Sequence, residues 1–200
     1  MENSNVREPT QKRAIEKKNK IIEYGFNLMC EKGYHNTDTA EIAKAANVST
    51  GIVYQYFNDK KDIFLQGLEL YSKNLMFPIN ELNGKKINKN NLETEFKKII
   101  QKSIKSHKLS KIAHAEILAM QHTDDDVAKI FQKQELESTE ILVNTLINND
   151  ITTIDVYEKA HLIISWIDEL SHEIVYHNHA NMDYDKMTNL VINAIVNLLN

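Results

Sequence analysis

Eight histidines are the side chains in this sequence best suited to bind a metal ion or to move a proton. Six of them fall in two stretches, which contain His107, His114 and His122, and then His172, His177 and His179. None of them forms His-Glu-x-x-His, the pattern in which two imidazoles one helical turn apart bind zinc. No nucleophile and base stand at a recognisable spacing either. We therefore predict neither a metal site nor an enzymatic activity, with a helical metal protein or enzyme as the alternative.

Three consecutive carboxylates, at residues 124–126, resemble a run of calcium ligands. They directly precede Val127 and Ile130, which have the spacing of an inward helix face. Because the first turn of a helix favours negative charge, the simpler interpretation is the start of a helix. The sequence therefore predicts no calcium site, and no cofactor is expected.

Length and composition favour an all-α protein. The 200 residues suffice for one large or two small domains with a sizeable core, and two prolines and five glycines supply too few turns for a many-stranded sheet. The single cysteine, Cys30, excludes an intramolecular disulfide framework, and the polar start of the chain resembles no signal peptide. The longest apolar runs, such as residues 162–167, are far shorter than the roughly 20 residues that span a bilayer. A cytoplasmic protein is expected.

Charge is distributed unevenly along the chain. Residues 1–61 contain ten Lys and Arg and eight Asp and Glu, whereas the remainder contains fourteen and twenty. Most of the N-terminal excess lies in residues 11–20, where five basic side chains accompany only Glu16. Such a segment is either a solvated helix end or the electrostatic footprint of a nucleic-acid partner.

The N-terminal segment has clear helix start and stop signals. Apolar residues at helical spacing predict an amphipathic helix over about residues 10–32, which ends at Gly33. Asp38 and Glu41 have the spacing of a capping box, in which each side chain accepts a backbone N–H of the other residue. A second, short helix therefore starts at this point.

A third helix, predicted over about residues 50–57, follows after a turn of about four residues. Asn47 tolerates the positive φ of a tight turn, and Ser49 is a suitable N-cap. Two short helices joined in this way form a helix-turn-helix, whose second helix fits the major groove of DNA. Its expected inward face comprises Ile52, Val53 and Phe57, and its outward face comprises Thr50, Gly51 and Tyr54, with Gln55 on the flank.

The stretch from residue 21 to residue 64 resembles the TetR family of bacterial repressors at nearly every motif position. The matching residues are Glu31-Lys32-Gly33-Tyr34, Thr37, Ile42-Ala43, Val48-Ser49, Gly51, Tyr54-Gln55-Tyr56-Phe57, Lys60 and Phe64. Asn47 departs from the family's usual glycine but accepts the same turn geometry. Asp38 departs from the usual threonine or serine and is expected to cap a helix, because a free anion would weaken binding to DNA.

The resemblance implies eight DNA contacts, namely Thr37, Thr39, Thr50, Gly51, Tyr54, Gln55, Tyr56 and Lys60. Hydroxyls and Lys60 at helix starts suit phosphate oxygens, whereas Thr50, Tyr54 and Gln55 can reach base edges. For Tyr56, a place in the core is an equally good interpretation.

The rest of the chain predicts further helices. A fourth helix is expected from residue 58 or 59 to about residue 75, and the Asn-rich segment 80–91 has the composition of a mobile loop. Later helices are expected over about residues 92–107, 110–122, 124–148, 154–181 and 184–199. We divide the chain into a DNA-binding domain, residues 1–61, with a basic N-terminal arm, and a ligand-binding and dimerisation domain, residues 62–200.

The last two predicted helices carry apolar stripes wider than packing on their own core requires. The excess predicts a partner subunit, and in the TetR family these two helices of each subunit form a four-helix dimer interface. The expected interface residues are Ile163, Ile167, Leu170, Ile174, Leu190, Val191, Ile195 and Leu198. Helices fully buried within one chain are the alternative.

Large apolar side chains on the middle helices are core residues by default. In the TetR family the same space is commonly a ligand pocket. The resemblance implies such a pocket near Phe96, Ile100, His114, Ile117, Met120, Gln121, Phe131 and Trp166.

These patterns together predict an all-α protein of about nine helices. Its expected function is that of a homodimeric, ligand-responsive repressor, which a small apolar or aromatic molecule releases from a pseudo-palindromic operator. A helical scaffold that binds another protein through the apolar stripes remains a further alternative.

Overall fold

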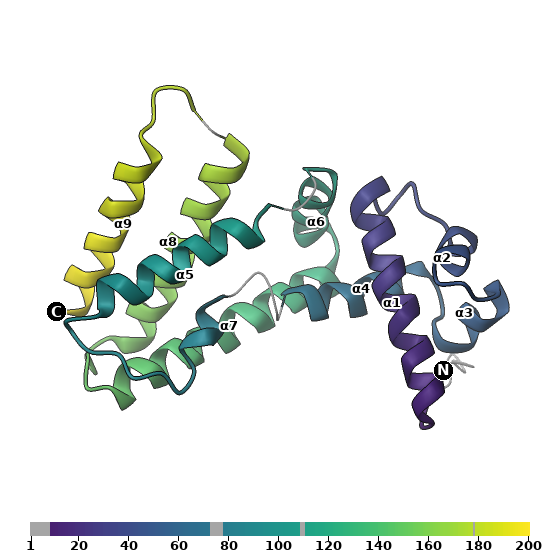
Figure 1. The fold of residues 1–200 in the computed structure, drawn as a ribbon, viewed down its shortest axis with the longest axis horizontal. Helices are drawn as coiled ribbons and strands as arrows, with labels where there is room; N and C mark the ends of the chain where they lie inside the picture. Colours follow the sequence, from purple (N-terminus) through teal and green to yellow (C-terminus); the bar gives the residue numbers. More distant parts are fainter. Residues whose placement is uncertain (1–8, 73–77, 109–110, 178) are drawn as a thin grey trace. The chain divides into compact units, whose positions relative to one another are not determined.

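A computed structural model describes residues 9–72, 78–108, 111–177 and 179–200, and the regular elements in these ranges are all helical. The predicted all-α class is confirmed. The α-helices are α1 (Lys12–Lys32), α2 (Thr39–Ala45), α3 (Thr50–Tyr56), α4 (Lys60–Tyr71), α5 (Leu92–Ser106), α6 (Lys111–Thr123), α7 (Asp125–Asn148), α8 (Val156–His172) and α9 (Tyr184–Leu199) (Figure 1). A 3-10 helix, η2, covers Pro78–Leu82, and a π-helical turn, η3, continues α8 over Glu173–His177.

The described residues form two compact units. Unit 1 combines the described residues of 1–71 with those of 109–130, and unit 2 combines those of 72–108 with 131–200. Helices α4 and α6 belong to unit 1 because both pack on α1. The sequence-based division after residue 61 instead assigns both helices to the second domain. Amphipathic patterns locate a helix but do not say which neighbour its apolar face contacts.

Helix α1 organises unit 1 and contacts α2, α3, α4 and α6 (Figure 1). Its closest approach to α4 requires Gly67, because a Cβ at this position would lie 2.5 Å from Cβ of Phe26. The Phe64 ring packs against the rings of Phe26 and Tyr34, with centroid separations of 5.8 and 5.0 Å. The start of α4 is thereby fixed against the loop that joins α1 to α2.

The turns around α2 and α3 have the predicted geometry. The Glu41 N–H donates to Asp38 Oδ1 at 2.8 Å, and the Asp38 N–H donates to Glu41 Oε2 at 3.3 Å, which completes the capping box. Asn47 adopts a φ of 55°, as a tight turn requires. Ser49 occupies the N-cap position of α3, although its side chain makes no capping hydrogen bond.

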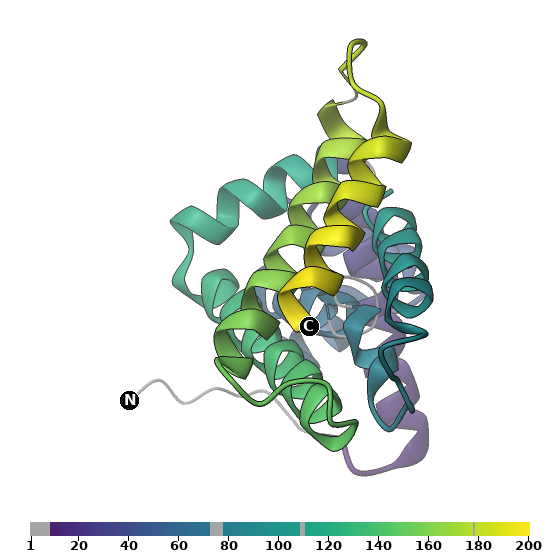
Figure 2. The same cartoon turned by 90° about the vertical axis from the view of Figure 1, so that its left-hand side faces the viewer.

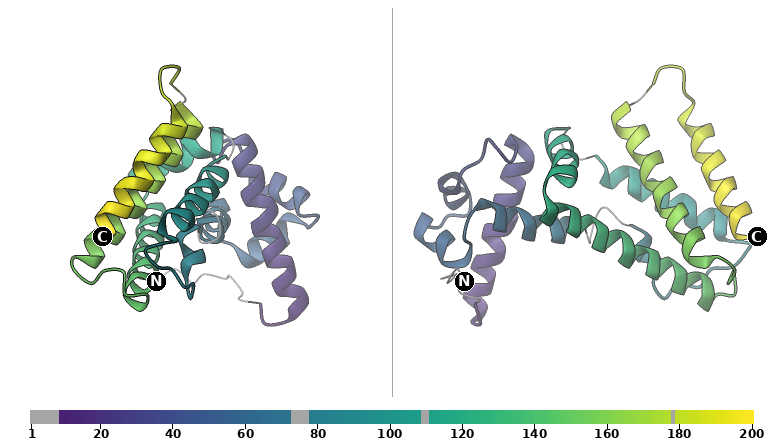
Figure 3. Two further views of the ribbon diagram at one scale, coloured as in Figure 1. Left: turned by 60° about the vertical axis from the view of Figure 1, so that its left-hand side comes forward. Right: turned by 180° about the vertical axis from the view of Figure 1, so that it is seen from behind.

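Unit 2 is built on an antiparallel pair, α8 and α9, which run side by side and both contact α5 (Figures 2 and 3). Its core combines apolar side chains from α5, the C-terminal half of α7, α8 and α9. These include Phe96, Ile100, Leu142, Leu146, Ile163, Ile167, Ile192 and Ile195. Within the described ranges, no helix is both long and apolar enough to cross a membrane.

The segment predicted as a mobile loop, residues 80–91, is anchored in the structure. Ile79, Leu82 and Ile87 are buried. Asn149 Oδ1 accepts the Ile87 N–H at 3.0 Å, and Asn149 Nδ2 donates to the Lys85 carbonyl at 3.1 Å. The asparagine-rich composition of the segment gave no sign of its two buried aliphatic residues, Leu82 and Ile87. The expected end of the fourth helix, near residue 75, lies outside the described residues.

Candidate functional site

The outer face of α3 is exposed, and its inner face is buried. Thr50, Gly51 and Tyr54 are exposed, with 52% of the Tyr54 surface accessible, and Gln55 is half-buried. Val53 and Phe57 are buried, as predicted for the inner face, and Ile52 is half-buried. The helix therefore presents two hydroxyl groups and a carboxamide beside a glycine that leaves its backbone uncovered.

The first residue of α2 lies next to this face. The Tyr54 hydroxyl donates to Thr39 Oγ1 at 3.4 Å. The nearby carboxylates are occupied, because Asp38 caps α2 and Glu41 forms an ion pair with Lys32. The Lys32 ammonium, followed by the Asp38 N–H, keeps the pKa of Glu41 below its usual value. The negative charge that Asp38 introduces is thus used in capping, as the sequence predicts.

Lys60 connects three parts of the N-terminal fold. Its ammonium donates to the carbonyls of Tyr34 at 2.7 Å and Thr37 at 2.8 Å, and it lies 4.5 Å from the centre of the Tyr34 ring. An ammonium has three N–H groups, so these bonds use two of them. Lys60 therefore stabilises the loop between α1 and α2, a role that its position at a helix start did not reveal.

Two of the predicted DNA contacts have buried side chains, and this is a correction to their placement. Thr37 is 2% exposed, and its hydroxyl donates to the Gly33 carbonyl at 2.9 Å. Tyr56 is 6% exposed, in accord with its alternative interpretation as a core aromatic. A match to a family motif does not distinguish framework residues from contact residues, because both types recur in the motif.

A contact that the sequence did not indicate joins α6 to the loop after α1. The Tyr34 N–H donates to the carboxylate of Glu116. The φ of Gly33 is 96°, which favours glycine, and a Cβ there would lie 2.5 Å from Glu116 Oε1, so the flexible end of that side chain would have to move. No local sequence pattern links Glu116 to Tyr34, because the two residues are 82 positions apart.

The start of α4 is also tied to the beginning of α7. The Lys61 ammonium lies 2.7 Å from Asp124 Oδ2 and 2.9 Å from Asp126 Oδ2. The hydrogen bond to Asp124 and then that to Asp126 raise the pKa of Lys61. Asp124 Oδ1 also accepts the N–H groups of Asp126 and Val127, which confirms the predicted helix start.

The basic stretch lies on the N-terminal half of α1. Lys12, Arg13, Lys17 and Lys20 are exposed. Lys18 is half-buried, with its ammonium 5.8 Å from the centre of the Phe57 ring that ends α3. One face of unit 1 therefore carries positive charge close to the C-terminal end of α3.

The predicted ligand residues fall in both units. Phe96, Ile100, Phe131 and Trp166 belong to unit 2, whereas His114, Ile117, Met120 and Gln121 belong to unit 1. Within unit 2 there is a cavity of about 280 Å³, part of it open to solvent. Its lining comprises Pro78, Ile79, Ile99, Ser103, Ile164, Ile167 and Asp168, none of which was predicted as a ligand contact.

The predicted interface residues separate into two classes. Ile163, Ile167, Leu170 and Ile195 are at most 5% exposed within a single chain, which makes them core residues of unit 2. Leu190 is 68% exposed, and Ile174, Val191 and Leu198 are half-buried. The width of an apolar stripe did not show which half of it faces the chain's own core.

One group of side chains in the described ranges has the spacing of metal ligands. Ligand atoms of Glu173, His177 and His179 all lie within 4.8 Å of one another. The sequence predicts no metal site at His177 and His179, because neither forms a known zinc motif with Glu173. That prediction therefore did not include Glu173 as a ligand.

Comparison with known proteins agrees with this geometry. A family model described as "Bacterial regulatory proteins, tetR family" matches residues 21–66. The transcriptional regulator HbdR of Aromatoleum sp. is 44% identical over 54 residues, which cover 27% of this chain and 24% of HbdR. The match thus spans about a quarter of the length of HbdR. Its length is similar to that of the segment matched by the family model.

Solved structures share the fold of the whole chain. A Mesorhizobium loti protein described as a TetR-family transcriptional regulator has a TM-score of 0.70 at 17% identity, with 94% of this chain and 98% of that chain covered. The regulator FadR of Bacillus subtilis, in complex with stearoyl-CoA, has a TM-score of 0.58 at 22% identity, with 91% and 99% covered. The N-terminal segment is therefore similar in sequence to the tetR family of bacterial regulatory proteins, and the whole chain has the fold of these solved structures.

Proposed function

We propose that this protein is a homodimeric transcriptional repressor that binds a pseudo-palindromic operator through α3 and is released by a small apolar or aromatic molecule. The observation that carries the proposal is the outer face of α3. Its exposed Thr50, Gly51 and Tyr54 stand on a helix whose other face is buried. A helix presented in this way fits the major groove of DNA.

The exposed residues have distinct proposed roles. Thr50, Tyr54 and Gln55 contact base edges, and Gly51 lets the DNA backbone approach closely. Thr39 contacts a phosphate, and Lys60 donates its third N–H to another. The exposed cations of α1, among them Arg13 and Lys17, add phosphate contacts that are independent of sequence.

Dimerisation is proposed through the exposed parts of α8 and α9. Leu190 is 68% and Leu162 is 45% exposed, large fractions for apolar side chains. The same two helices also carry the half-buried Trp166, Val191 and Leu198. A two-fold pairing of this surface would present two copies of α3 to the two halves of a palindrome.

The proposed effector site is the cavity of unit 2, with Phe96, Ile100, Phe131 and Trp166 of the same unit as further expected contacts. Four isoleucines line the cavity, and Ser103 and Asp168 supply its polar groups. Bacillus subtilis FadR, which shares the fold, is described in complex with stearoyl-CoA. The predominance of aliphatic side chains in this lining supports a small apolar effector.

Release from DNA requires a path from the effector to α3. Helix α6 follows α5 in the chain, and its Glu116 accepts the Tyr34 N–H in the loop before α2. A displacement of α6 would therefore disturb the loop that Lys60 also stabilises. The effector can shift this equilibrium only by the difference in its affinity for the two states, typically about 1 to 3 kcal/mol.

The test is binding of the purified protein to fluorescent DNA taken from upstream of its own gene. Tyr54→Ala is expected to weaken binding by about 1 to 3 kcal/mol, the usual cost of losing a base contact. Tyr157→Ala is the matched control, since Tyr157 is similarly exposed, at 55%, on α8. Arg13→Ala should lower the salt dependence of binding instead, as expected for a phosphate contact. Equal binding by the Tyr54 and Tyr157 variants would exclude α3 as the recognition helix.

A further inference from the structure

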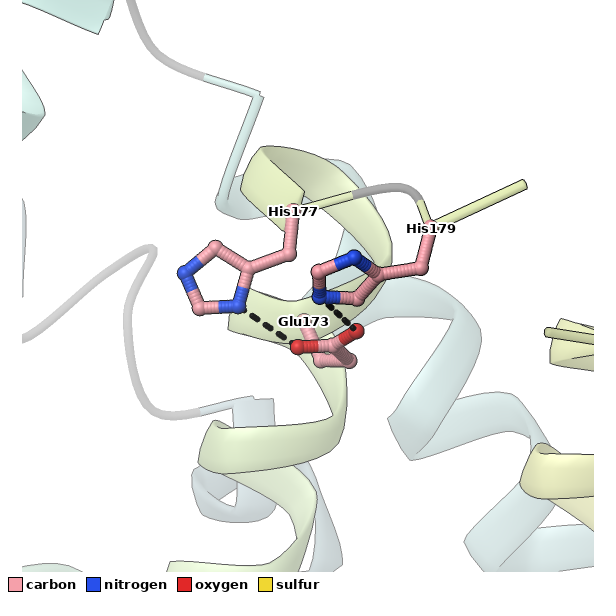
Figure 4. A group of neighbouring side chains, drawn as sticks. All are labelled: Glu173, His177 and His179. Carbon is pink, nitrogen blue, oxygen red and sulfur yellow. Dashed lines mark hydrogen bonds and ion pairs between the residues drawn. The ribbon is translucent and has the colours of Figure 1, made fainter. Parts of the chain in front are cut away.

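The end of α8 brings together three side chains with the donor atoms of a metal site. Glu173 begins the π-helical turn, His177 ends it, and His179 follows two residues later. Figure 4 shows both imidazoles directed at the Glu173 carboxylate. His177 Nδ1 lies 2.6 Å from Glu173 Oε2, and His179 Nε2 lies 3.5 Å from Glu173 Oε1. The two imidazole rings thus contact different oxygens of the Glu173 carboxylate.

The distances between the two histidine nitrogens and the Glu173 oxygens suit an ion that takes the place of the hydrogens between them. Zinc binds imidazole nitrogen and carboxylate oxygen at about 2.0 to 2.2 Å, so neighbouring ligand atoms of a tetrahedral site are roughly 3.4 Å apart. The contact between His179 and Glu173 has nearly this length, and the shorter one to His177 needs a widening within the reach of side-chain rotation. Two imidazoles and one carboxylate leave a coordination position for water, as in open zinc sites.

Groups around the three ligands fix their orientation. The Tyr184 hydroxyl donates to Glu173 Oε1 at 3.2 Å and accepts the backbone N–H of His179 at 2.5 Å. The His172 ring packs edge-on against the His177 ring, with 5.0 Å between centroids. Metal ligands are commonly oriented by such outer hydrogen bonds. A merely solvated cluster of polar residues would not require them.

Accessibility and charge also favour binding of a cation. The side chains of His177 and His179 are 46% and 61% exposed, whereas that of Glu173 is only 14% exposed. Glu173 supplies the one carboxylate ligand of the group, beside the two imidazoles. The carboxylate therefore lies inside, and the two imidazoles lie at the rim.

We propose that Glu173, His177 and His179 form a binding site for one divalent transition-metal ion of the zinc class. Imidazole ligands favour such ions over Mg²⁺ and Ca²⁺, which prefer oxygen. The bound ion would connect the end of α8 to the segment that leads into α9, whose first residue is Tyr184. The site contributes no atom to the proposed DNA-binding face, and its test uses no DNA.

The experiment is a Zn²⁺ titration of tag-free protein against a chromophoric chelator, with Co²⁺ absorption as a second readout of coordination. Wild-type protein should bind one equivalent of Zn²⁺. The His177→Ala, His179→Ala and Glu173→Gln variants should bind Zn²⁺ at least tenfold more weakly. Tyr184→Phe keeps all three ligands and should weaken binding about tenfold, the lower end for loss of an outer hydrogen bond. Mg²⁺ should not displace the bound Co²⁺.

His161→Ala is the matched control. His161 Nε2 lies 3.6 Å from Glu135 Oε1, a pair to which the described residues add no third ligand. This variant should keep wild-type affinity. Far-UV circular dichroism without metal shows whether each variant is folded, and Glu173→Gln and Tyr184→Phe test the site if an alanine variant is not. Failure of wild-type protein to bind Zn²⁺, or wild-type affinity in folded ligand variants, would overturn the proposal.

Discussion

The α2–α3 segment and the α8–α9 pair are stabilised in different ways. Around α2 and α3, the short helices depend on individual polar contacts, such as the capping box of Asp38 and the bridge from Lys60 to two carbonyls. In α8 and α9, the largest buried groups are aliphatic, and each side chain shares its contacts with many others. Polar bonds can be removed singly, whereas apolar packing responds to volume and charge.

This difference determines how well each segment can be interpreted from sequence. A capping residue has a defined partner three positions away, so its role is local. An isoleucine on a wide apolar stripe has no defined partner, and only its neighbours in space decide whether it lies in the core or at the surface. Substitutions can test both modes of stabilisation, the individual polar contacts of one segment and the apolar packing of the other.

The largest effect is expected when a charge is placed in the core of the α8–α9 pair. Ile195 is fully buried, whereas Leu190, on the same helix, is 68% exposed. Ile195→Asp should destabilise unit 2 by more than about 4 kcal/mol, since an unpaired carboxylate would lie among aliphatic groups. Urea unfolding followed by the fluorescence of Trp166, the single tryptophan, measures this loss.

Leu190→Asp is the control for that experiment. The free energy of unfolding of the monomer should change little, while a dimer formed through this surface should dissociate in light scattering. A stable, dimeric Ile195→Asp protein would show that Ile195 is not a core residue, and the comparison drawn above would fail.

A second effect concerns the close contact between α1 and α4. Gly67→Ala would place a Cβ 2.5 Å from Cβ and 2.6 Å from Cγ of Phe26, so the two helices must separate. Overpacking of this kind should destabilise unit 1 by about 1 to 3 kcal/mol. Circular dichroism during thermal unfolding is the measurement.

Gly51→Ala is the matched substitution on α3. The nearest atom to its Cβ would be Ser49 Oγ at 4.0 Å, so the exchange should be neutral or stabilise the helix by up to about 1 kcal/mol. Equal destabilisation by both exchanges would show that the close contact with Phe26 is not the reason for a glycine at residue 67.

A third effect is the loss of the Lys60 bridge. Lys60→Met keeps the aliphatic stem and leaves the carbonyls of Tyr34 and Thr37 without their ammonium partner. A destabilisation of about 1 to 2 kcal/mol is expected, at the lower end for charged hydrogen bonds because the site is only partly buried. Urea unfolding should show it without any DNA present. Lys44→Met, at an exposed position on α2, is the control and should have no effect.

The smallest effect is a pH dependence in unit 2. Burial lowers the pKa of His107, but the hydrogen bond and charge of Asp168, 3.2 Å away, together with the Ser103 carbonyl, raise it above its ordinary value of 6.5. A raised pKa stabilises the fold fully below the unfolded-state pKa, and this contribution disappears as the pH rises through the folded-state pKa. Asp168→Asn should therefore lower the urea midpoint more at about pH 5.5 than at about pH 8.5. A difference that grows with pH would contradict the pairing.

Several features were predictable because their determinants are local. The capping box of Asp38, the turn at Asn47 and the start of α7 at Asp124 each involve residues within a few positions of one another. Helix boundaries in the C-terminal half also followed from periodicity, except that the helix predicted over residues 154–181 ends earlier, as α8 at His172 and a π-helical turn at His177. No local signal marks that turn.

The amino-acid sequence by itself determined the all-α class, the helix-turn-helix and the outward orientation of Thr50, Gly51 and Tyr54, because helical periodicity and capping act over one or two turns. Only the tertiary structure decided that Thr37 and Tyr56 are buried, that Glu116 and Lys60 stabilise the loop before α2, and that Ile195 is core while Leu190 is exposed. These outcomes depend on which segments, far apart in the chain, exclude water from one another. Hydrophobic burial is non-directional. A sequence therefore indicates how much apolar surface must be buried, but it does not indicate which segments bury it.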